Sequence, residues 1–181
     1  MRRPENRNKA PESGNGPGLV IGIDPGSIYC GYGVVRQTER GECLYVSSGR
    51  IRMRGGAPLA SRLLELFGGL TEVMKEFSPQ ACVVEKIFFA RGVRAALSLG
   101  HARGIALLAG AMGGVPVYEY SPLEVKQAVT GYGRAGKGQV QEMIKRLLGL
   151  SFSPSTDGAD ALALALCHLH RQGINGRGLP S

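Results

Sequence analysis

The chain has 181 residues, of which 43% are hydrophobic and 20% charged. This length and composition are typical of one globular domain with a full core, and they exclude collagen, a coiled coil and a wholly disordered chain. Lys and Arg exceed Asp and Glu by 22 to 14, and most of the surplus lies in residues 86–146, which carry nine bases and three acids. Such a basic third predicts either a surface that binds a polyanion or an ordinary solvated face.

The chain ends and the cysteines bear on location. The N-terminus has no signal-peptide-like stretch and no apolar run approaches the roughly 18–20 residues that span a bilayer, so we expect a cytoplasmic protein without membrane contact. The four cysteines lack the CxxC spacing of a zinc site and predict free, mostly buried thiols. Residues 1–18 predict a disordered basic arm and residues 172–181 a flexible tail, which leaves one domain over 19–171.

Strand and helix patterns alternate along this domain. Short apolar runs predict strands at 19–24, 31–37, 43–53, 81–85 and 115–120. Apolar side chains three and four residues apart predict a helix after Pro58 that Ser78-Pro79 ends, and further helices are expected at 93–112, 122–129, 137–149 and 157–170. The first and fourth strands should be parallel neighbours, because the helix between them supplies a crossover. The predicted fold class is α/β, with a mixed central sheet of about five strands flanked by helices.

Two of the predicted buried strands end in a carboxylate. Asp24 follows LVIGI and Glu85 follows ACVV, so parallel pairing brings both to the sheet edge where open α/β sheets place their sites. Asp157 and Asp160, in STDGADALALAL, lie three residues apart and share one helix face. Four converging carboxylates repel one another unless a cation neutralises them, and oxygen ligands favour Mg²⁺, with Mn²⁺ able to substitute. Two such ions activate water and stabilise the leaving oxygen in phosphodiester cleavage.

Each acid also has a structural explanation. Asp24 precedes Pro-Gly, a common turn sequence. Asp157 suits a helix N-cap, and Asp160 suits the first turn of a helix, where the dipole favours an acid. Glu85 is harder to explain structurally, because an unpaired buried carboxylate at the end of an apolar strand is costly. Taken together, the four acids favour one acidic site.

Four segments carry a resemblance to a known family: GIDPGSIYCGYGVV, VVEKIFFARGVRAALSLGHARGIALLAG, EVKQAVTGYGRAGKGQVQEMIKRLLGL and TDGADALALALCH. Over about residues 19–170 the chain resembles the RuvC family of Holliday-junction resolvases. The resemblance implies an RNase H-like fold, a homodimer, and magnesium-dependent symmetric nicking of four-way DNA junctions in recombination and repair, with a RuvA–RuvB branch-migration complex as partner. It carries the catalytic, metal-binding acids onto Asp24, Glu85, Asp157 and Asp160. At the third of these positions some relatives have histidine, whereas this chain has aspartate.

The resemblance also implies DNA contacts. It places Phe88 where the family has an aromatic that stacks on an unpaired base, and it marks Lys126 and Lys137 as bases near the scissile DNA. Lys137 follows the Gly-rich GYGRAG and is predicted to begin a helix, which suits a phosphate contact. Arg94 and Arg134, in the same basic third, are further DNA-binding candidates. A solvated lysine at Lys126 and a core or interface role for Phe88 stay open as alternatives.

The remaining features, which are one helix, the N-terminal arm and the histidines, do not indicate a function by themselves. The Ala-, Gly- and Leu-rich helix predicted at 93–112 belongs to the dimer interface by resemblance, although core packing explains its composition equally well. The arm before Leu19 departs from the family, and the three histidines, which have no acid at ligand spacing, are expected to be structural.

Competing functions are a ribonuclease for RNA–DNA hybrids, a kinase or actin-like ATPase, which usually needs a second domain, and a junction-binding scaffold. Four acids argue against the scaffold, because acids without metal weaken DNA binding.

Overall fold

Five strands form one mixed sheet in the computed structural model, which describes residues 18–86 and 92–176. The strands are β1 (Leu19–Asp24), β2 (Tyr29–Gln37), β3 (Cys43–Arg52), β4 (Ala81–Glu85) and β5 (Val117–Tyr120). The helices are α1 (Leu59–Phe77), α2 (Val93–Met112), α3 (Pro122–Thr130), α4 (Lys137–Leu147) and α5 (Thr156–Gly176). The strand order is β3-β2-β1-β4-β5, in which β1, β4 and β5 are parallel and β2 is antiparallel to both of its neighbours. The predicted α/β class and the parallel pairing of β1 with β4 are confirmed.

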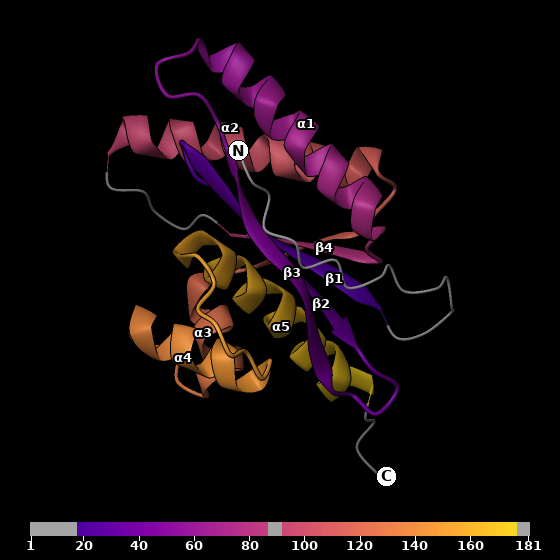
Figure 1. Cartoon of the computed structure of the whole chain (residues 1–181). Helices are drawn as coiled ribbons and strands as arrows, with labels where there is room; N and C mark the ends of the chain where they lie inside the picture. The colour runs from indigo at the N-terminus through magenta and orange to yellow at the C-terminus, as the bar shows by residue number, and fades with distance from the viewer. Residues whose placement is uncertain (1–17, 87–91, 177–181) are drawn as a thin grey trace.

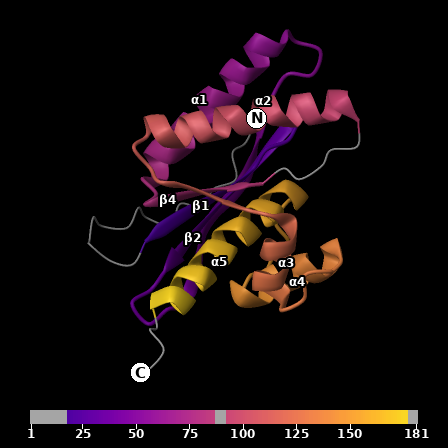
Figure 2. The same ribbon diagram turned by 180° about the vertical axis from the view of Figure 1, so that it is seen from behind.

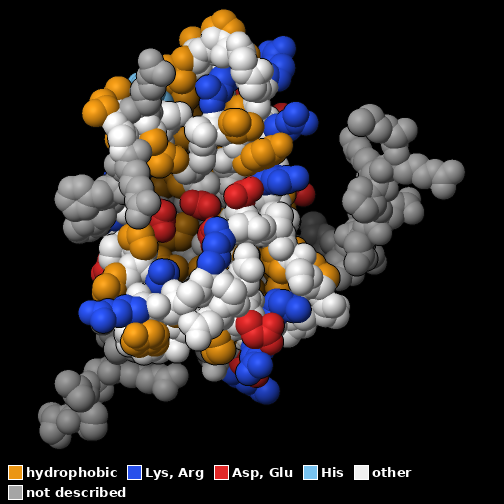
Figure 3. Space-filling view, turned by 90° about the vertical axis from the view of Figure 1, so that its left-hand side faces the viewer, with side chains coloured by type: hydrophobic (Ala, Val, Ile, Leu, Met, Phe, Trp, Pro, Cys, Tyr) orange, Lys and Arg blue, Asp and Glu red, His pale blue; other side chains and the backbone are white. Residues whose placement is uncertain are grey.

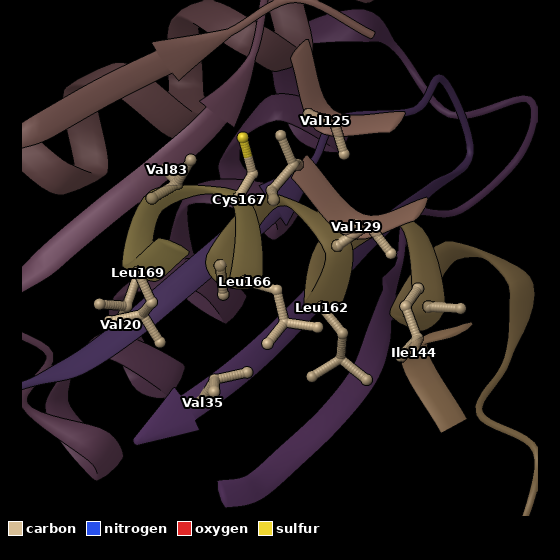
Figure 4. Close-up of a cluster of buried hydrophobic side chains, with 14 of the residues drawn as sticks. Val20, Val35, Val83, Val125, Val129, Ile144, Leu162, Leu166, Cys167 and Leu169 are labelled. Carbon is tan, nitrogen blue, oxygen red and sulfur yellow. The ribbon is translucent and has the colours of Figure 1, made fainter. Parts of the chain in front are cut away.

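Helices cover both faces of this sheet. Helices α1 and α2 lie on one face, and α5 crosses the other with α3 and α4 outside it (Figures 1 and 2). Strand β1 is buried on both sides, since Val20 packs toward α5 while Ile21 and Ile23 pack toward α1 and α2. Leu162 and Leu166 bring α5 into the core on its side (Figure 4). Burial on both faces explains why β1 is a continuous apolar run in the sequence.

Helix α5 packs unusually close to the sheet because two strand positions have no side chain. A Cβ on Gly22 would lie within 3.0 Å of the backbone of Ala161, and one on Gly31 within 3.0 Å of the backbone of Asp157. Real Cβ atoms do not approach so closely, so α5 can occupy this position only against glycine. Gly31 is the register partner of Asp24, and this contact therefore fixes the start of α5 beside the end of β1.

The C-terminal end of α5 corrects a predicted boundary. The helix continues to Gly176, so residues 172–176, which the sequence places in a flexible tail, are helical. Bonds to α3 explain the extension, because His170 Nδ1 lies 3.0 Å from the Ala128 carbonyl oxygen and Arg171 pairs with Glu124 at 3.0 Å. Residues 1–17 of the expected arm and 177–181 of the expected tail lie outside the described residues.

Helix α2 corrects the expectation that no apolar run approaches the length needed to span a bilayer. Its segment Ala95–Met112 has a mean hydropathy of 1.3 over 18 residues, so by length and composition alone it would cross a membrane. One face of α2 belongs to the domain core, however, because Ala102, Ala106 and Ala109 are buried there and Arg103 pairs with Glu119 of β5. Only 22% of the segment is buried, which leaves a largely apolar face exposed.

The cysteines and histidines lie largely as expected. All four cysteines are free, and Cys30, Cys82 and Cys167 are buried. His168 is buried, with Nδ1 3.0 Å from the Tyr120 hydroxyl, and its ring packs on Tyr118. These contacts are structural, which agrees with the prediction for His168.

Candidate active site

Four acidic side chains come together at the carboxyl edge of the sheet. The parallel strands β1 and β4 end side by side, which places Asp24 next to Glu85. The first turn of α5 reaches the same edge and carries Asp157 and Asp160. The charges of the other three acids all raise the pKa of Asp24. The structure therefore brings the four predicted acids into one electrostatic environment.

Ser155 caps α5, and this overturns one explanation of Asp157. The Ser155 hydroxyl accepts a hydrogen bond from the Gly158 amide at 3.2 Å, and its carbonyl accepts one from Ala159 at 2.8 Å. The helix begins at Thr156, so Asp157 lies inside the first turn instead of at the N-cap. The sequence-based capping explanation for Asp157 is wrong, and the helix does not need this carboxylate to begin.

The two carboxyl groups at the strand ends, Asp24 and Glu85, both have raised pKa values. Burial, followed by the charges of Glu85, Asp160 and Asp157, raises the pKa of Asp24 to about 7, against the opposing effect of Lys137. The pKa of Glu85 is also raised, by burial and then by the charge of Asp160. These shifts mean that the fully ionised cluster is disfavoured in the absence of a cation.

A cavity of about 220 Å³ opens beside the acids. Its charged lining consists of Asp24, Glu85, Asp160, Lys126 and Lys137, and Asp157 lies outside this lining. Figure 3 shows acidic side chains gathered in the middle of this face with Lys and Arg side chains around them. The cavity thus combines carboxylates, which suit a cation, with ammonium groups, which suit a phosphate.

Lys137 forms an ion pair inside this cavity. Its Nζ lies 2.6 Å from Asp160 Oδ2. Burial by itself lowers the pKa of Lys137, but the hydrogen bond and the charge of Asp160, together with Asp24 and Asp157, raise it above its ordinary value. Lys137 is therefore charged at neutral pH and neutralises part of the acidic cluster.

The acids fit a divalent cation by their chemistry, although they do not yet form a closed ligand shell. Within residues 18–86 and 92–176, no three Asp, Glu, His or Cys side chains are grouped closely enough to hold a metal ion. A cation would relieve the repulsion that raises the pKa of Asp24, and the oxygen-only donors suit a hard ion. Asp24, Glu85 and Asp160 line the cavity and would hold such a cation there, with Asp157 in the same electrostatic environment.

The predicted DNA-binding residues separate into three groups. Lys126 on α3 and Lys137 at the start of α4 lie in the cavity with the acids. Arg134 is exposed in the loop between these helices and does not line the cavity. Phe88 lies outside the described residues, as does the side chain of Arg94, whose backbone belongs to the first turn of α2.

Arg62 on α1 was not identified by sequence reasoning. Its guanidinium Nη2 donates to the carbonyl of Ser27, in the loop that directly follows Asp24. The Met53 amide donates to the Ile28 carbonyl at 2.9 Å and holds the same loop from β3. The Arg62–Ser27 bond joins residues 35 positions apart, so no local sequence pattern could have indicated it.

The strand order and the acids at the carboxyl edge define an RNase H-like nuclease domain. The family model of crossover junction endodeoxyribonuclease RuvC matches residues 20–168, and the chain belongs to the RuvC family. The RuvC of Pelotomaculum thermopropionicum is 50% identical over 153 residues, which cover 84% of this chain and 93% of that protein. The RuvC of Rubrobacter xylanophilus is 50% identical over 151 residues, which cover 83% and 84%.

Solved structures agree with this assignment. The structure of Thermus thermophilus RuvC in complex with a Holliday junction substrate is similar at a TM-score of 0.82 and 36% identity, over 87% of this chain and 96% of that chain. The yeast mitochondrial Holliday junction resolvase Ydc2 is similar at a TM-score of 0.67 and 14% identity, which shows a shared fold alone. The RNase H-like fold implied by the sequence resemblance is confirmed.

Proposed function

We propose that this protein is a Holliday junction resolvase, an endonuclease that makes paired symmetric nicks in four-way DNA junctions during recombination and repair. The observation that carries the proposal is one cavity, lined by three carboxylates and two lysines, at the carboxyl edge of the sheet in a member of the RuvC family. The Thermus relative is described in complex with a Holliday junction substrate, which supports the same substrate class here.

The acids have the metal-binding role in this proposal. Asp24, Glu85, Asp157 and Asp160 would hold Mg²⁺, or Mn²⁺ in its place, as two ions per site. When bound, these ions supply an activated water and stabilise the leaving oxygen of the phosphodiester. The other three acids all raise the pKa of Asp24, so Asp24 would gain most from the charge of a bound cation, and we assign it a central role in holding the ions.

The lysines position the DNA strand. Lys126 and Lys137 lie in the same cavity as the acids, so a phosphate that reaches the acids also reaches both ammonium groups. Lys137 has three N–H donors and shares them between Asp160 and any phosphate it contacts, so its DNA contact is coupled to the charge of that carboxylate. Arg134, Arg94 and Phe88 are proposed as further DNA contacts away from the cavity.

The exposed apolar face of α2 supports the proposal of a homodimer. Val93, Leu97 and Met112 are 76%, 59% and 69% exposed, and Leu64 of α1 is 70% exposed. An exposed apolar face that no other described element covers is typical of a protein–protein interface. A two-fold dimer presents two acidic sites to two strands, as paired incisions require.

Incubation of the purified protein with a synthetic mobile junction, with and without Mg²⁺, tests the proposal. We expect paired nicks at symmetric positions with Mg²⁺ only, and binding without nicking by Asp24→Asn. Cleavage of an RNA–DNA hybrid instead of the junction would identify a ribonuclease, and binding without any metal-dependent nicking would identify a scaffold. Normal nicking by Asp24→Asn would contradict the role of this acid.

Two cellular features rest on family membership alone. We propose a cytoplasmic location and a RuvA–RuvB complex as partner. The composition of residues 1–18, and not the family, supports a basic arm ahead of a nuclease domain that begins at residue 19 and includes α5 to Gly176. Stimulation of junction cleavage by purified RuvA and RuvB would support the partner. Equal cleavage with and without that complex would count against it.

A further inference from the structure

A second hollow lies on the outer side of α3 and α4, next to the cavity of the acids. Its volume is about 430 Å³, and it is lined by Thr130, Tyr132, Ala135, Gly138, Gln139, Glu142, Met143 and Arg146. The end of α3, the loop to α4 and the first turns of α4 form its walls. Nothing in the proposed cleavage chemistry uses this hollow.

The hollow adjoins the catalytic cavity at two points of the chain. On α3, Lys126 lines the cavity and Thr130, one helical turn further on, lines the hollow. At the start of α4, Lys137 lines the cavity and the adjacent Gly138 lines the hollow. One turn of helix rises about 5.4 Å, and a DNA strand rises about 3.4 Å per nucleotide. A strand that has a phosphate in the cavity and runs along α3 toward Thr130 would therefore reach the hollow within about two nucleotides.

Tyr132 stands at the edge of the hollow on a rigid support. Its amide donates to Thr130 Oγ1 at 3.1 Å, and its carbonyl accepts from the same hydroxyl at 3.0 Å and from the Ala135 amide at 3.1 Å. The side chain is nevertheless 58% exposed. A fixed backbone that presents an aromatic ring to solvent loses little entropy when a flat ligand stacks on that ring.

The polar groups of the hollow leave donors available. Gln139 Oε1 accepts from the Gly136 amide at 2.8 Å, and Arg146 Nε bonds to Glu142 at 3.1 Å. Among the described residues, Gln139 Nε2 and the terminal nitrogens of Arg146 have no hydrogen-bond partner. Residues 126–146 carry five bases and one acid, so the surroundings attract a polyanion. An aromatic ring, free donors and positive charge are together the requirements for binding a nucleotide.

We propose that this hollow binds one nucleotide of the junction, within about two nucleotides of the cut, with its base stacked on Tyr132. The inference rests on the proposed junction-cleaving function and adds a base contact on the α3–α4 side of the site. Stacking on Tyr132 requires a base that has left its pair, and opening is least costly at a branch point, where base stacking is interrupted. Gln139 and Arg146 then donate to acceptor atoms of that nucleotide.

Junction binding in the presence of a chelator tests the contact without cleavage. We expect Tyr132→Ala to weaken binding about 5- to 150-fold, the effect of losing one stacked base, and Tyr132→Phe to stay within about twofold of the wild type. Phe152→Ala is the matched control, because Phe152 is an exposed aromatic that packs against Tyr45 and lines neither cavity. Thermal melting of each variant confirms that it is folded.

A fluorescent base analogue locates the nucleotide. With 2-aminopurine placed singly on either side of the mapped cut, wild-type binding should change the emission at one position, and Tyr132→Ala should abolish that change. The inference is wrong if Tyr132→Ala binds like the wild type, if it loses no more affinity than Phe152→Ala, or if Tyr132→Phe is as weak as Tyr132→Ala. Wild-type protein that never nicks the junction refutes the proposed function, whereas loss of binding by Tyr132→Ala alone still supports the contact.

Discussion

Replacing Asp24 with asparagine removes one charge from the acidic cluster at nearly constant size. In the folded protein the pKa of Asp24 is about 7, against an ordinary value of 3.8. The folded state therefore holds the Asp24 proton more strongly than the unfolded state, and the free energy of unfolding falls as the pH rises from about 4 to 7. Asparagine, like the protonated acid, carries no charge, so the variant does not lose this stability as the pH rises. Asp24→Asn should therefore be more stable than the metal-free wild type at neutral pH.

The magnitude follows from the two pKa values. A difference between 3.8 and about 7 corresponds to an upper limit of about 4 kcal/mol at pH 8, and to about 2 kcal/mol at pH 5, where only the unfolded state is largely ionised. The stability advantage of Asp24→Asn should therefore grow by about 2.5 kcal/mol from pH 5 to pH 8. Added Mg²⁺ should raise the stability of the wild type at pH 8 and have little effect on the variant.

Urea unfolding in chelator at pH 5, 6.5 and 8 measures this difference. Glu72→Gln provides a control, because Glu72 is an exposed acid on α1 and is absent from the residues that shift the pKa of Asp24. Only the pH dependence that Asp24→Asn shows in excess of this control is attributed to the acidic cluster. An advantage of Asp24→Asn that stays constant between pH 5 and 8, or a variant less stable than the wild type at pH 8, would refute the proposed repulsion.

Three further substitutions test other parts of the molecule. Lys137→Ala should leave Asp160 without its ion pair and slow junction nicking at least tenfold, measured as single-turnover rate, while Lys145→Ala, on the same helix outside both cavities, serves as control. Arg62→Gln should release the loop after Asp24 and lower the single-turnover rate without weakening junction binding in chelator; weakened binding would instead indicate a direct DNA contact. Leu97→Glu should shift the protein from dimer to monomer in sedimentation, and an unchanged mass would exclude the α2 face as the interface.

The sheet and its acidic edge could be predicted because each depends on short stretches of sequence. Burial on both faces makes β1 and β4 continuous apolar runs, and the helix between them requires parallel pairing. These two facts alone place Asp24 beside Glu85. The position of α5 relative to them depends instead on glycines that admit its backbone, and a glycine in a strand does not show which element approaches it.

Contacts between distant segments account for what the sequence did not indicate. Ser155 and Asp157 are both good N-caps, and the packing of α5 against Gly31 decides in favour of Ser155. The sequence after Leu169 is polar and glycine-containing, and bonds from His170 and Arg171 to α3 hold the start of this stretch in the helix. In both cases local preference allows two answers, and tertiary packing selects one of them.

The charge of the cavity explains why a basic surface must accompany an acidic centre. The three carboxylates and two lysines that line the cavity, together with Asp157 outside its lining, sum to a formal charge of minus two when all are ionised, so the metal-free site repels a phosphate. Two divalent cations would reverse that sign to plus two and make phosphate entry favourable only in the loaded protein. Junction binding without metal must then depend on bases outside the cavity, such as Arg134 and Arg146 on the α3–α4 side. Salt should therefore weaken metal-free binding steeply, because these exposed charges supply its attraction to the phosphates.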